Sequence, residues 1–384
     1  MIENSLITLN ESAVENNIAF LKKKLGDKVK ISAVVKANAY GHGIEQVVPL
    51  FEKYGIEHYS VFHYSEALRV YDSLSKPATI MVMGWLGEED IREAITKGIE
   101  FFVFNTERLN VAIKQAKELN VKAKIHLEAE TGMNRLGLNT DELHNAIITI
   151  KENAQYVEIA GFCTHLAGAE SVSNHVRIQS QLKKYKKMLA TFEANDLIPR
   201  YKHVSNSAAA FAYPNARMDL VRIGIMLYGF WSSSEVYVRY INLKSNKIDP
   251  LQRILGWNSQ IMAIKKVKSG EFIGYGISYL AQTDITTALV PVGYSYGYSR
   301  SLSNKGRVLI GGQRHSVIGV VNMNMIIVDI TQNTEAKIGD EVVLIGKQGD
   351  LEIKVSAFSE ISEELNYEIL AHLSESITRT VIKK

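Results

Sequence analysis

Short apolar runs typical of buried strands recur through about the first 230 residues of this chain, separated by stretches with a helical period. Strands that alternate with helices pair in parallel and carry the helices on the outside. Eight such units match a (β/α)8 barrel of the TIM type. An open doubly wound sheet is the alternative, but no G-x-G-x-x-G turn follows the first strand. The expected strands are 31–35, 59–64, 78–84, 100–105, 123–130, 157–166, 201–206 and 220–229.

The pattern changes near Tyr240, where helical periods give way to short strands between Gly, Asn and Asp turns. Two domains also fit the length, because one hydrophobic core rarely serves 384 residues. We therefore expect a barrel domain at 1–239 and a smaller, mainly β domain at 240–384, with a strand in 1–10 as a candidate to pair with the second domain. The strands expected there are 260–267, 286–291, 307–310, 316–321, 325–329 and 341–345, before a helix at 355–365.

The composition is that of an ordinary globular protein, with 46% hydrophobic and 22% charged residues. The net charge is only +3 (44 basic and 41 acidic residues) and there is no basic tract, so neither nucleic acid nor a membrane surface is an expected partner. We see no signal peptide and no apolar run near the ~20 residues of a membrane helix. The lone cysteine, Cys163, suits a reducing compartment. These features predict a cytoplasmic protein.

The first expected strand leads into the sequence VVKANAYGHG at 34–43. A lysine at the end of a buried strand is costly unless its amine is paired, neutral or covalently bound. For Lys36 alone, a surface lysine on an ordinary loop is the simpler interpretation. However, Asn38, Tyr40 and His42 add hydrogen-bonding groups to a loop that glycine allows to approach a ligand closely. The stretch therefore predicts a binding site.

Reactive groups of such barrels lie where the strands end. A lone histidine on an apolar strand is more often a satisfied core residue, and a serine after asparagine more often caps a helix. Their joint occurrence on one rim is harder to dismiss and predicts an active site. The strand ends supply Lys36, Glu128, Arg135, His165, Ser207, Arg222 and Gly224.

The fifth expected strand carries polar residues at every second position, including His126 and Glu128. A period of two places this polar set on one face, inside the barrel, and the apolar set against the helices. Barrel interiors are usually filled by branched aliphatic side chains. The polar face therefore predicts a bound polar ligand or a buried arginine as its partner.

Residues 34–43 closely resemble the cofactor loop of the pyridoxal-phosphate-dependent alanine racemases, and the match extends from Lys36 to Tyr367, with a second strong motif at 131–137. The resemblance implies a homodimer with shared active sites that interconverts L- and D-alanine and supplies D-alanine for bacterial peptidoglycan. Lys36 would hold pyridoxal 5'-phosphate as a Schiff base and then serve as a base on one face of the substrate Cα. Tyr275, from the partner subunit, would serve the other face. No metal is implied.

The resemblance also assigns the remaining groups. Arg222 would meet the pyridine nitrogen, and because an arginine keeps its charge it cannot protonate that nitrogen, which favours proton return over transamination or decarboxylation. A free phenol titrates near ~10, so His165 and Arg222 would have to stabilise the Tyr275 phenolate. Hydroxyl groups and backbone amides would hold the phosphate. These donors would be Tyr40, Ser207, Gly224, Ile225 and Tyr367.

The resemblance places Arg135, together with the Met323 amide of the partner subunit, at the substrate carboxylate and Tyr294 at the entrance. Family members commonly carry a lysine, often carbamylated, in place of Glu128, and we expect the Glu128 carboxylate to support Arg135 in its stead. Acidic residues are common where Tyr296 and Asn324 stand, which leaves substrate range open. Prolines common near Tyr298 and before Arg379 are also missing.

Three alternatives remain at this point. The nearest is a racemase for serine or for a broad range of amino acids. A decarboxylase on the same cofactor is disfavoured by Arg222, because that chemistry needs a protonated ring. A non-catalytic pyridoxal-phosphate carrier built on the barrel alone would have no need of the second domain or of Tyr275.

Overall fold

The computed structural model describes residues 5–383. The chain divides into two compact units. We call the first, made of 13–37 and 47–252, the barrel unit. The second, which we call the β unit, comprises the described residues of 1–12, 38–46 and 253–384.

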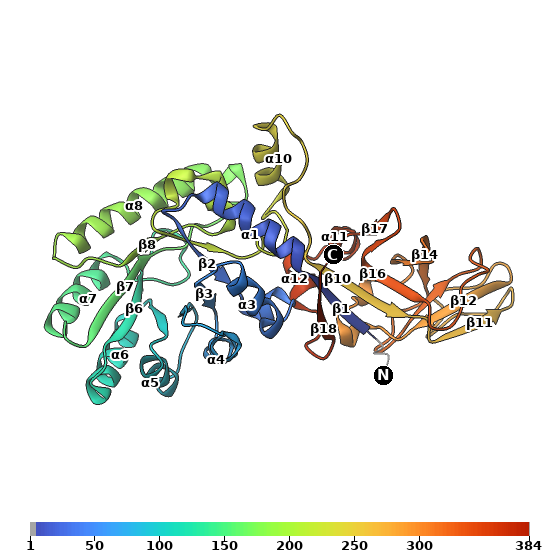
Figure 1. Ribbon diagram of the computed structural model, residues 1–384, viewed down its shortest axis with the longest axis horizontal. Coiled ribbons are helices and arrows are strands. Elements are labelled where there is room, and N and C mark those ends of the chain that lie inside the picture. The colour runs from blue at the N-terminus through green and yellow to red at the C-terminus, as the bar shows by residue number, and fades with distance from the viewer. Residues whose placement is uncertain (1–4, 384) are drawn as a thin grey trace. The chain divides into compact units, whose positions relative to one another are not determined.

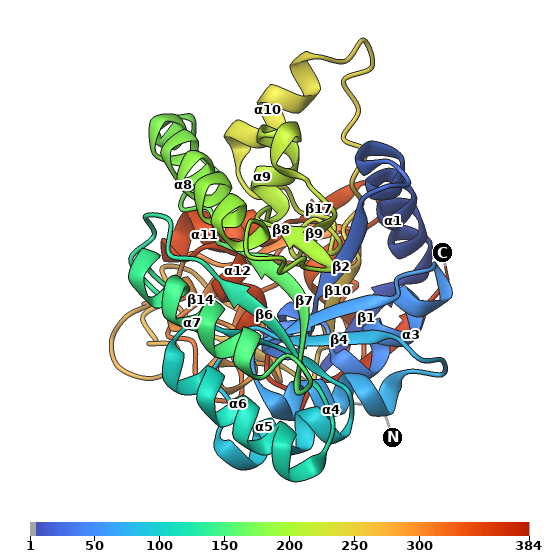
Figure 2. The same ribbon diagram turned by 90° about the vertical axis from the view of Figure 1, so that its left-hand side faces the viewer.

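The barrel unit is built on eight parallel strands in the order β8-β7-β6-β5-β4-β3-β2-β9 (Figures 1 and 2). The outermost two, β8 and β9, are joined by a bridge between Asn206 and Arg222, which closes the ring. The expectation of a (β/α)8 barrel is therefore confirmed, although most strands end earlier than expected. The strands are β2 (Lys30–Val34), β3 (His58–Val61), β4 (Thr79–Val82), β5 (Glu100–Val103), β6 (Ala123–Glu128), β7 (Val157–Cys163), β8 (Tyr201–His203) and β9 (Leu220–Ile223).

Helices follow the strands and cover the outside of the ring, as α4 to α8 show in Figure 2. Local capping fixes their ends: the Asn105 side chain accepts from the Arg108 amide, and Asn139 with Glu142 forms a capping box. The helices are α1 (Glu11–Leu25), α2 (Lys36–Tyr40), α3 (Ile44–Lys53), α4 (Tyr64–Ser73), α5 (Glu88–Thr96), α6 (Thr106–Leu119), α7 (Thr140–Glu152), α8 (His175–Glu193), α9 (Ser207–Ala212) and α10 (Ser234–Asn242), with 3-10 turns at Val172–Asn174 and Pro214–Ala216.

The β unit contains one sheet in the order β11-β12-β15-β14-β13-β16-β10-β1-β18, with β17 paired to β16. The N-terminal strand β1 pairs antiparallel with β10 and parallel with β18. Residues 1–4 of the expected N-terminal strand lie outside the described residues. The strands are β1 (Ser5–Asn10), β10 (Leu255–Gln260), β11 (Ala263–Val267), β12 (Ile285–Val290), β13 (Arg307–Ile310), β14 (Gln313–Ile318), β15 (Ile326–Asp329), β16 (Glu341–Gln348), β17 (Leu351–Ile353) and β18 (Thr378–Ile382).

Two expected elements of the β unit differ in the structure. The strand expected at 260–267 is split. The Ile261 amide donates to the Asp340 carbonyl, whereas the Met262 amide donates to the Leu289 carbonyl. The chain therefore pairs with different strands before and after this point. The helix expected at 355–365 ends earlier, at a left-handed residue, Glu363, and a second helix then contains Tyr367. The elements are α11 (Val355–Ser362), α12 (Asn366–Ala371) and 3-10 turns at Tyr294–Tyr296 and Arg300–Leu302.

None of the helices within residues 5–383 is long and apolar enough to span a membrane.

Candidate active site

The turn after β2 is left-handed. Four successive residues, Ala37 to Tyr40, have φ between 51° and 54°, which costs an L-residue roughly 1–2 kcal/mol each. Hydrogen bonds hold both ends: the Glu66 carboxylate accepts from the Ala37 amide at 2.6 Å, and the Asn38 side chain accepts from the Ile44 amide at 3.1 Å. The loop expected after Lys36 is thus a short left-handed helix.

Lys36 begins this turn at the rim of the barrel unit. Burial and the charge of Arg135 lower the pKa of its amine, and the Glu66 carboxylate opposes them. The amine lies 5.9 Å from the centre of the Phe62 ring. Glu66, which also accepts from the Phe62 and His63 amides, has no counterpart among the expected site residues. Its position three residues after His63 is the only sequence signal, and histidine is an uncommon helix cap.

The loop after β6 carries Arg135 and is closed like a small hairpin. The Glu130 amide donates to the Leu138 carbonyl at 2.9 Å, and the Leu138 amide donates to the Glu128 carbonyl at 2.8 Å. The Glu130 carboxylate accepts from the amides of Gly132 and Asn134. A Cβ on Gly137 would lie 2.7 Å from the Glu130 nitrogen, so only glycine fits this close approach. Arg135 itself is exposed at the tip.

Gln181 ties the ends of β6 and β7 together from helix α8. Its side-chain amide donates to the His165 carbonyl at 3.1 Å and to the Thr131 hydroxyl at 3.3 Å, and its oxygen accepts from the Ala167 amide. Gln181 is 1% exposed. A buried glutamine inside a helical pattern gives no sequence signal of its own, which explains why this support was missed.

Ser207 and Gly224 meet at the ends of β8 and β9. The Gly224 amide donates to the Ser207 hydroxyl oxygen at 3.0 Å, so two of the donors expected at a phosphate lie side by side. Asn206 caps helix α9 by accepting from the Ala209 amide. Ile225, 1% exposed, follows directly in the chain.

A polar chain runs from Arg222 through the barrel interior. The Arg222 guanidinium donates to His203 Nδ1 and, at 2.9 Å, to the Thr164 carbonyl. Because arginine only donates, His203 must donate from Nε2 to His126 Nδ1, 2.9 Å away, and His126 from Nε2 to Glu100, 2.7 Å away. Burial and the Arg222 charge keep the pKa of His203 well below its usual value. The polar face of β6 is thus connected to a buried arginine, because His126 is linked to Arg222 through His203.

Glu100 anchors the far end of this chain. Burial alone raises the pKa of its carboxyl, but the His126 hydrogen bond and the charges of His126, His58 and Arg200 bring the pKa to about 2. Arg200 contacts the other oxygen at 3.0 Å.

Glu100→Gln should lower the free energy of unfolding by about 3–5 kcal/mol at pH 7, because the buried partners lose their carboxylate. The folded pKa lies below the ordinary 4.5, so this stabilisation is complete above about pH 4.5 and disappears as pH falls towards 2. Urea unfolding between pH 7 and pH 3 measures it. Glu158→Gln, at the more exposed partner of Arg200, is the control and should have little effect. An equal loss in both variants would contradict the assignment.

The Glu128 side chain is 5% exposed, and the cations Arg222 and Arg135 act on it. Burial raises the pKa of its carboxyl, whereas the charges of Arg222 and Arg135 lower it. Within the described residues no ion pair joins Glu128 to Arg135, so the two interact through space rather than by contact. The expected support of Arg135 by Glu128 remains a prediction.

If Arg135 holds a substrate carboxylate, as the resemblance implies, Glu128→Gln should raise the KM for that substrate severalfold, because Arg135 loses the field of a nearby carboxylate. Steady-state kinetics in both directions measures the effect. Glu128→Lys should recover activity when bicarbonate is added, whereas Glu128→Met should not. Unchanged KM and kcat in Glu128→Gln would refute the role.

In the β unit, Tyr40 and Tyr367 lie together with ring centres 6.0 Å apart. Burial raises the pKa of the Tyr40 hydroxyl. A Cβ on Gly41 would lie 1.8 Å from the Leu370 carbonyl oxygen, so glycine lets helix α12 approach this turn. The Arg379 guanidinium donates to the Gly41 carbonyl at 2.9 Å and fixes the turn from the other side.

A second group in the β unit lines an open hollow of about 620 Å³ that includes Tyr275, Tyr294, Met323 and Asn324. Tyr275 is 75% exposed on a loop whose flanking glycines have φ near +70°. The Ser295 hydroxyl donates to the Met323 carbonyl and accepts from the Asn324 side chain, which joins the two segments. The sequence-predicted Tyr275, Tyr294 and Met323 thus share one surface.

Comparisons with known proteins agree with this arrangement. The family models "Alanine racemase, N-terminal domain" and "Alanine racemase, C-terminal domain" match residues 9–231 and 254–381. The chain is 32% identical to an alanine racemase of Leptospira interrogans, over 99% of this chain and 96% of that one.

Solved structures are similar over the same length. One is alanine racemase of Bacillus anthracis with bound L-Ala-P, at 29% identity and a TM-score of 0.91, covering 100% of this chain and 96% of that one. Another, from Bartonella henselae with covalently bound pyridoxal phosphate, has 27% identity and a TM-score of 0.84 and covers 98% of this chain and 99% of that one. The chain therefore belongs to the alanine racemase family of isomerases.

Proposed function

We propose that this protein interconverts L- and D-alanine with pyridoxal 5'-phosphate, as a homodimer, and that its D-alanine serves cell-wall peptidoglycan. The observation that carries the proposal is the partly buried Lys36 amine on the same rim as the Ser207–Gly224 pair and Arg222. Strands β8, β9 and β2, which end in these groups, are consecutive around the barrel unit.

The residues present fit the cofactor. Lys36 has an amine whose pKa is lowered by burial, which favours the neutral form that attacks a carbonyl. Ser207 and the Gly224 amide, now bonded to each other, would both turn to the phosphate, with Ile225, Tyr40 and Tyr367 as further donors. Arg222 would face the pyridine nitrogen. When bound, the cofactor supplies an electron-withdrawing ring for charge that develops at the substrate Cα.

Lys36 would take or return the proton on one face of Cα, and Tyr275 of the partner subunit on the other. The exposure of Tyr275 in this chain suits a residue that serves a second copy. Burial and the nearby charges of Arg222, Arg135 and Lys36 lower the pKa of His165 to about 3. A neutral His165 can orient the phenol, so the positive charge that stabilises its phenolate has to come from Arg222.

Arg135 and the Met323 amide of the partner subunit would hold the substrate carboxylate. Arg135 lies at the tip of a loop whose shape is set by Glu130 and Gly137. Its exposed guanidinium can reach a carboxylate without the desolvation cost that a buried arginine carries. Tyr294 and Asn324 line the same hollow as Met323 and are candidates to set which side chains enter.

The test incubates the purified, cofactor-loaded protein with single L-amino acids and follows each by chiral chromatography. We expect D-alanine to form fastest, with an equilibrium near equal amounts of both forms. Faster conversion of serine would favour the alternative, a serine or broad-range racemase, for which Tyr296 and Asn324 at usually acidic positions are the motive. Release of carbon dioxide, or no conversion of any amino acid, would overturn the proposal.

A further inference from the structure

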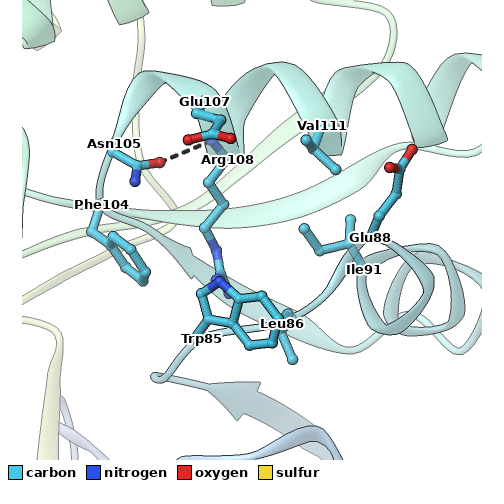
Figure 3. Close-up of a pocket in the computed structure, with 9 residues that line it drawn as sticks. All are labelled: Trp85, Leu86, Glu88, Ile91, Phe104, Asn105, Glu107, Arg108 and Val111. Carbon is cyan, nitrogen blue, oxygen red and sulfur yellow. Dashed lines mark hydrogen bonds between the residues drawn. The ribbon is translucent and has the colours of Figure 1, made fainter.

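A separate pocket of about 250 Å³ lies in the barrel unit beyond the ends of β4 and β5, between helices α5 and α6 (Figure 3). About half of its wall is apolar, and Lys36 is not part of it. The apolar lining consists of Trp85, Leu86, Ile91, Phe104 and Val111.

Arg108 is the polar centre of this pocket. Figure 3 shows its side chain running from α6 towards the Trp85–Leu86 segment, and its Nη2 donates to the neighbouring Gly84 carbonyl at 3.0 Å. The residue is only 5% exposed, yet its Nε and Nη1 have no hydrogen-bond partner anywhere in residues 5–383. The guanidinium carbon lies 4.8 Å from the centre of the Phe104 ring.

An unpaired buried guanidinium is a costly arrangement, since buried charges in native proteins are normally paired and hydrogen-bonded. No carboxylate opposes the loss of hydration, and burial lowers the pKa of Arg108 to about 10, so the group still carries its charge near pH 7. An aromatic ring beside the guanidinium stabilises the cation but accepts none of its in-plane N–H bonds. These two N–H groups belong to a residue that lines the pocket, so an acceptor bound there would satisfy them.

The charges around the pocket limit what that acceptor can be. Glu88 forms an ion pair with Lys114 at 2.6 Å and accepts a hydrogen bond from the Gln115 side-chain amide at 2.9 Å. Glu107 also lines the pocket and is exposed. The single Arg108 guanidinium, 5% exposed, can pair with one negative charge, and the exposed Glu107 carboxylate disfavours a second one, as in phosphate.

The surface beside Arg108 limits the rest of the ligand. Trp85 is 70% exposed, although a large indole is normally at least partly covered. A cavity of about 250 Å³ admits a body of roughly ten non-hydrogen atoms against the indole and the aliphatic wall. We propose that the Trp85–Arg108 pocket binds a small monocarboxylate with a flat, apolar body, its carboxylate on Arg108 and its body on Trp85.

The probe is phenylacetate, titrated calorimetrically into the full-length, cofactor-loaded protein. Phenylacetamide has the same shape without the charge, and inorganic phosphate has the charge without the apolar body. We expect saturable binding of phenylacetate and about 10- to 100-fold weaker binding of both others, because hydrogen bonds to a charged group and apolar burial are both required. Equal binding of phenylacetate and phosphate would contradict the proposal that an apolar body is required for binding.

Substitutions test whether phenylacetate binds in the Trp85–Arg108 pocket. Arg108→Met should weaken phenylacetate binding about 10- to 100-fold. Arg92→Met is the matched control, since Arg92 lies on α5 outside the pocket and bonds to Gln115 and Glu118, and it should bind as the unaltered protein does. Trp85→Ala changes only an exposed side chain and should also weaken binding, which keeps the test decisive if Arg108→Met does not fold.

Thermal unfolding separates this role from a structural one. If the role of Arg108 is to bind a ligand, Arg108→Met should keep or raise the unfolding midpoint, because the substitution removes an unpaired buried charge. Phenylacetate should then raise the midpoint of the unaltered protein and leave that of Arg108→Met unchanged. The proposal is overturned if phenylacetate does not bind, or if it binds equally to the unaltered protein, Arg108→Met and Trp85→Ala.

Discussion

Lys36→Ala should abolish racemisation in both directions, with a loss of about four orders of magnitude or more, and should remove the visible absorbance of the lysine-bound cofactor. The lysine has two roles in the proposed reaction, so its loss affects cofactor attachment and proton transfer together. Lys36 lies partly buried just after β2, with Glu66 and Arg135 acting on the pKa of its amine.

Chiral chromatography from each alanine enantiomer and an absorbance spectrum measure both effects. Lys30→Ala is the matched control: it removes a lysine from the start of the same strand, where the side chain is half-exposed and 3.6 Å from Glu57. That variant should keep its spectrum and its activity. Turnover by Lys36→Ala at more than a hundredth of the normal rate would contradict the assignment.

Tyr275→Phe should keep the cofactor spectrum yet lose about 10²- to 10⁴-fold in racemisation, the usual contribution of one positioned acid–base group. The largest loss is expected for proton removal from L-alanine, the face that Lys36 does not serve. The side chain is largely exposed, so the substitution should leave the unfolding midpoint unchanged.

Exchange of the Cα hydrogen in deuterium oxide, started from L- and from D-alanine, separates the two faces. Tyr279→Phe is a suitable control, because Tyr279 lies on the same segment but packs against the core around Ile273 and Ile318. It should exchange both enantiomers normally. Normal turnover by Tyr275→Phe would refute the second base.

The barrel could be predicted from the sequence because its strands are apolar runs of regular spacing, and the hydrogen-bond pattern of parallel strands leaves few other arrangements. The grouping of polar residues on one rim could also be predicted, because the ends of the strands converge in a barrel. The left-handed turn at Ala37–Tyr40 could not be predicted, because alanine and tyrosine normally avoid φ > 0. Hydrogen bonds to the side chains of Glu66 and Asn38 help to hold it, as does the bond from the Gly43 amide to the Asn38 carbonyl.

Contacts between residues that are far apart in the chain could not be predicted from the sequence either. His203 and Glu100 lie 103 positions apart (203 minus 100), yet one histidine joins them in the folded barrel. Gln181 and Arg108 sit in ordinary helical patterns, and only the fold reveals that one is fully bonded and the other is not.

The central claim is that Lys36 of one chain and Tyr275 of another act on the same Cα, and mixed dimers test it most directly. Lys36→Ala and Tyr275→Phe proteins, each nearly inactive, are unfolded together in equal amounts, refolded and loaded with cofactor. In a mixed two-fold dimer one site holds both lesions and the other holds none. Random assortment makes roughly half of the dimers mixed, so about a quarter of normal alanine racemisation should return. Mixtures that form dimers and stay inactive would contradict the account.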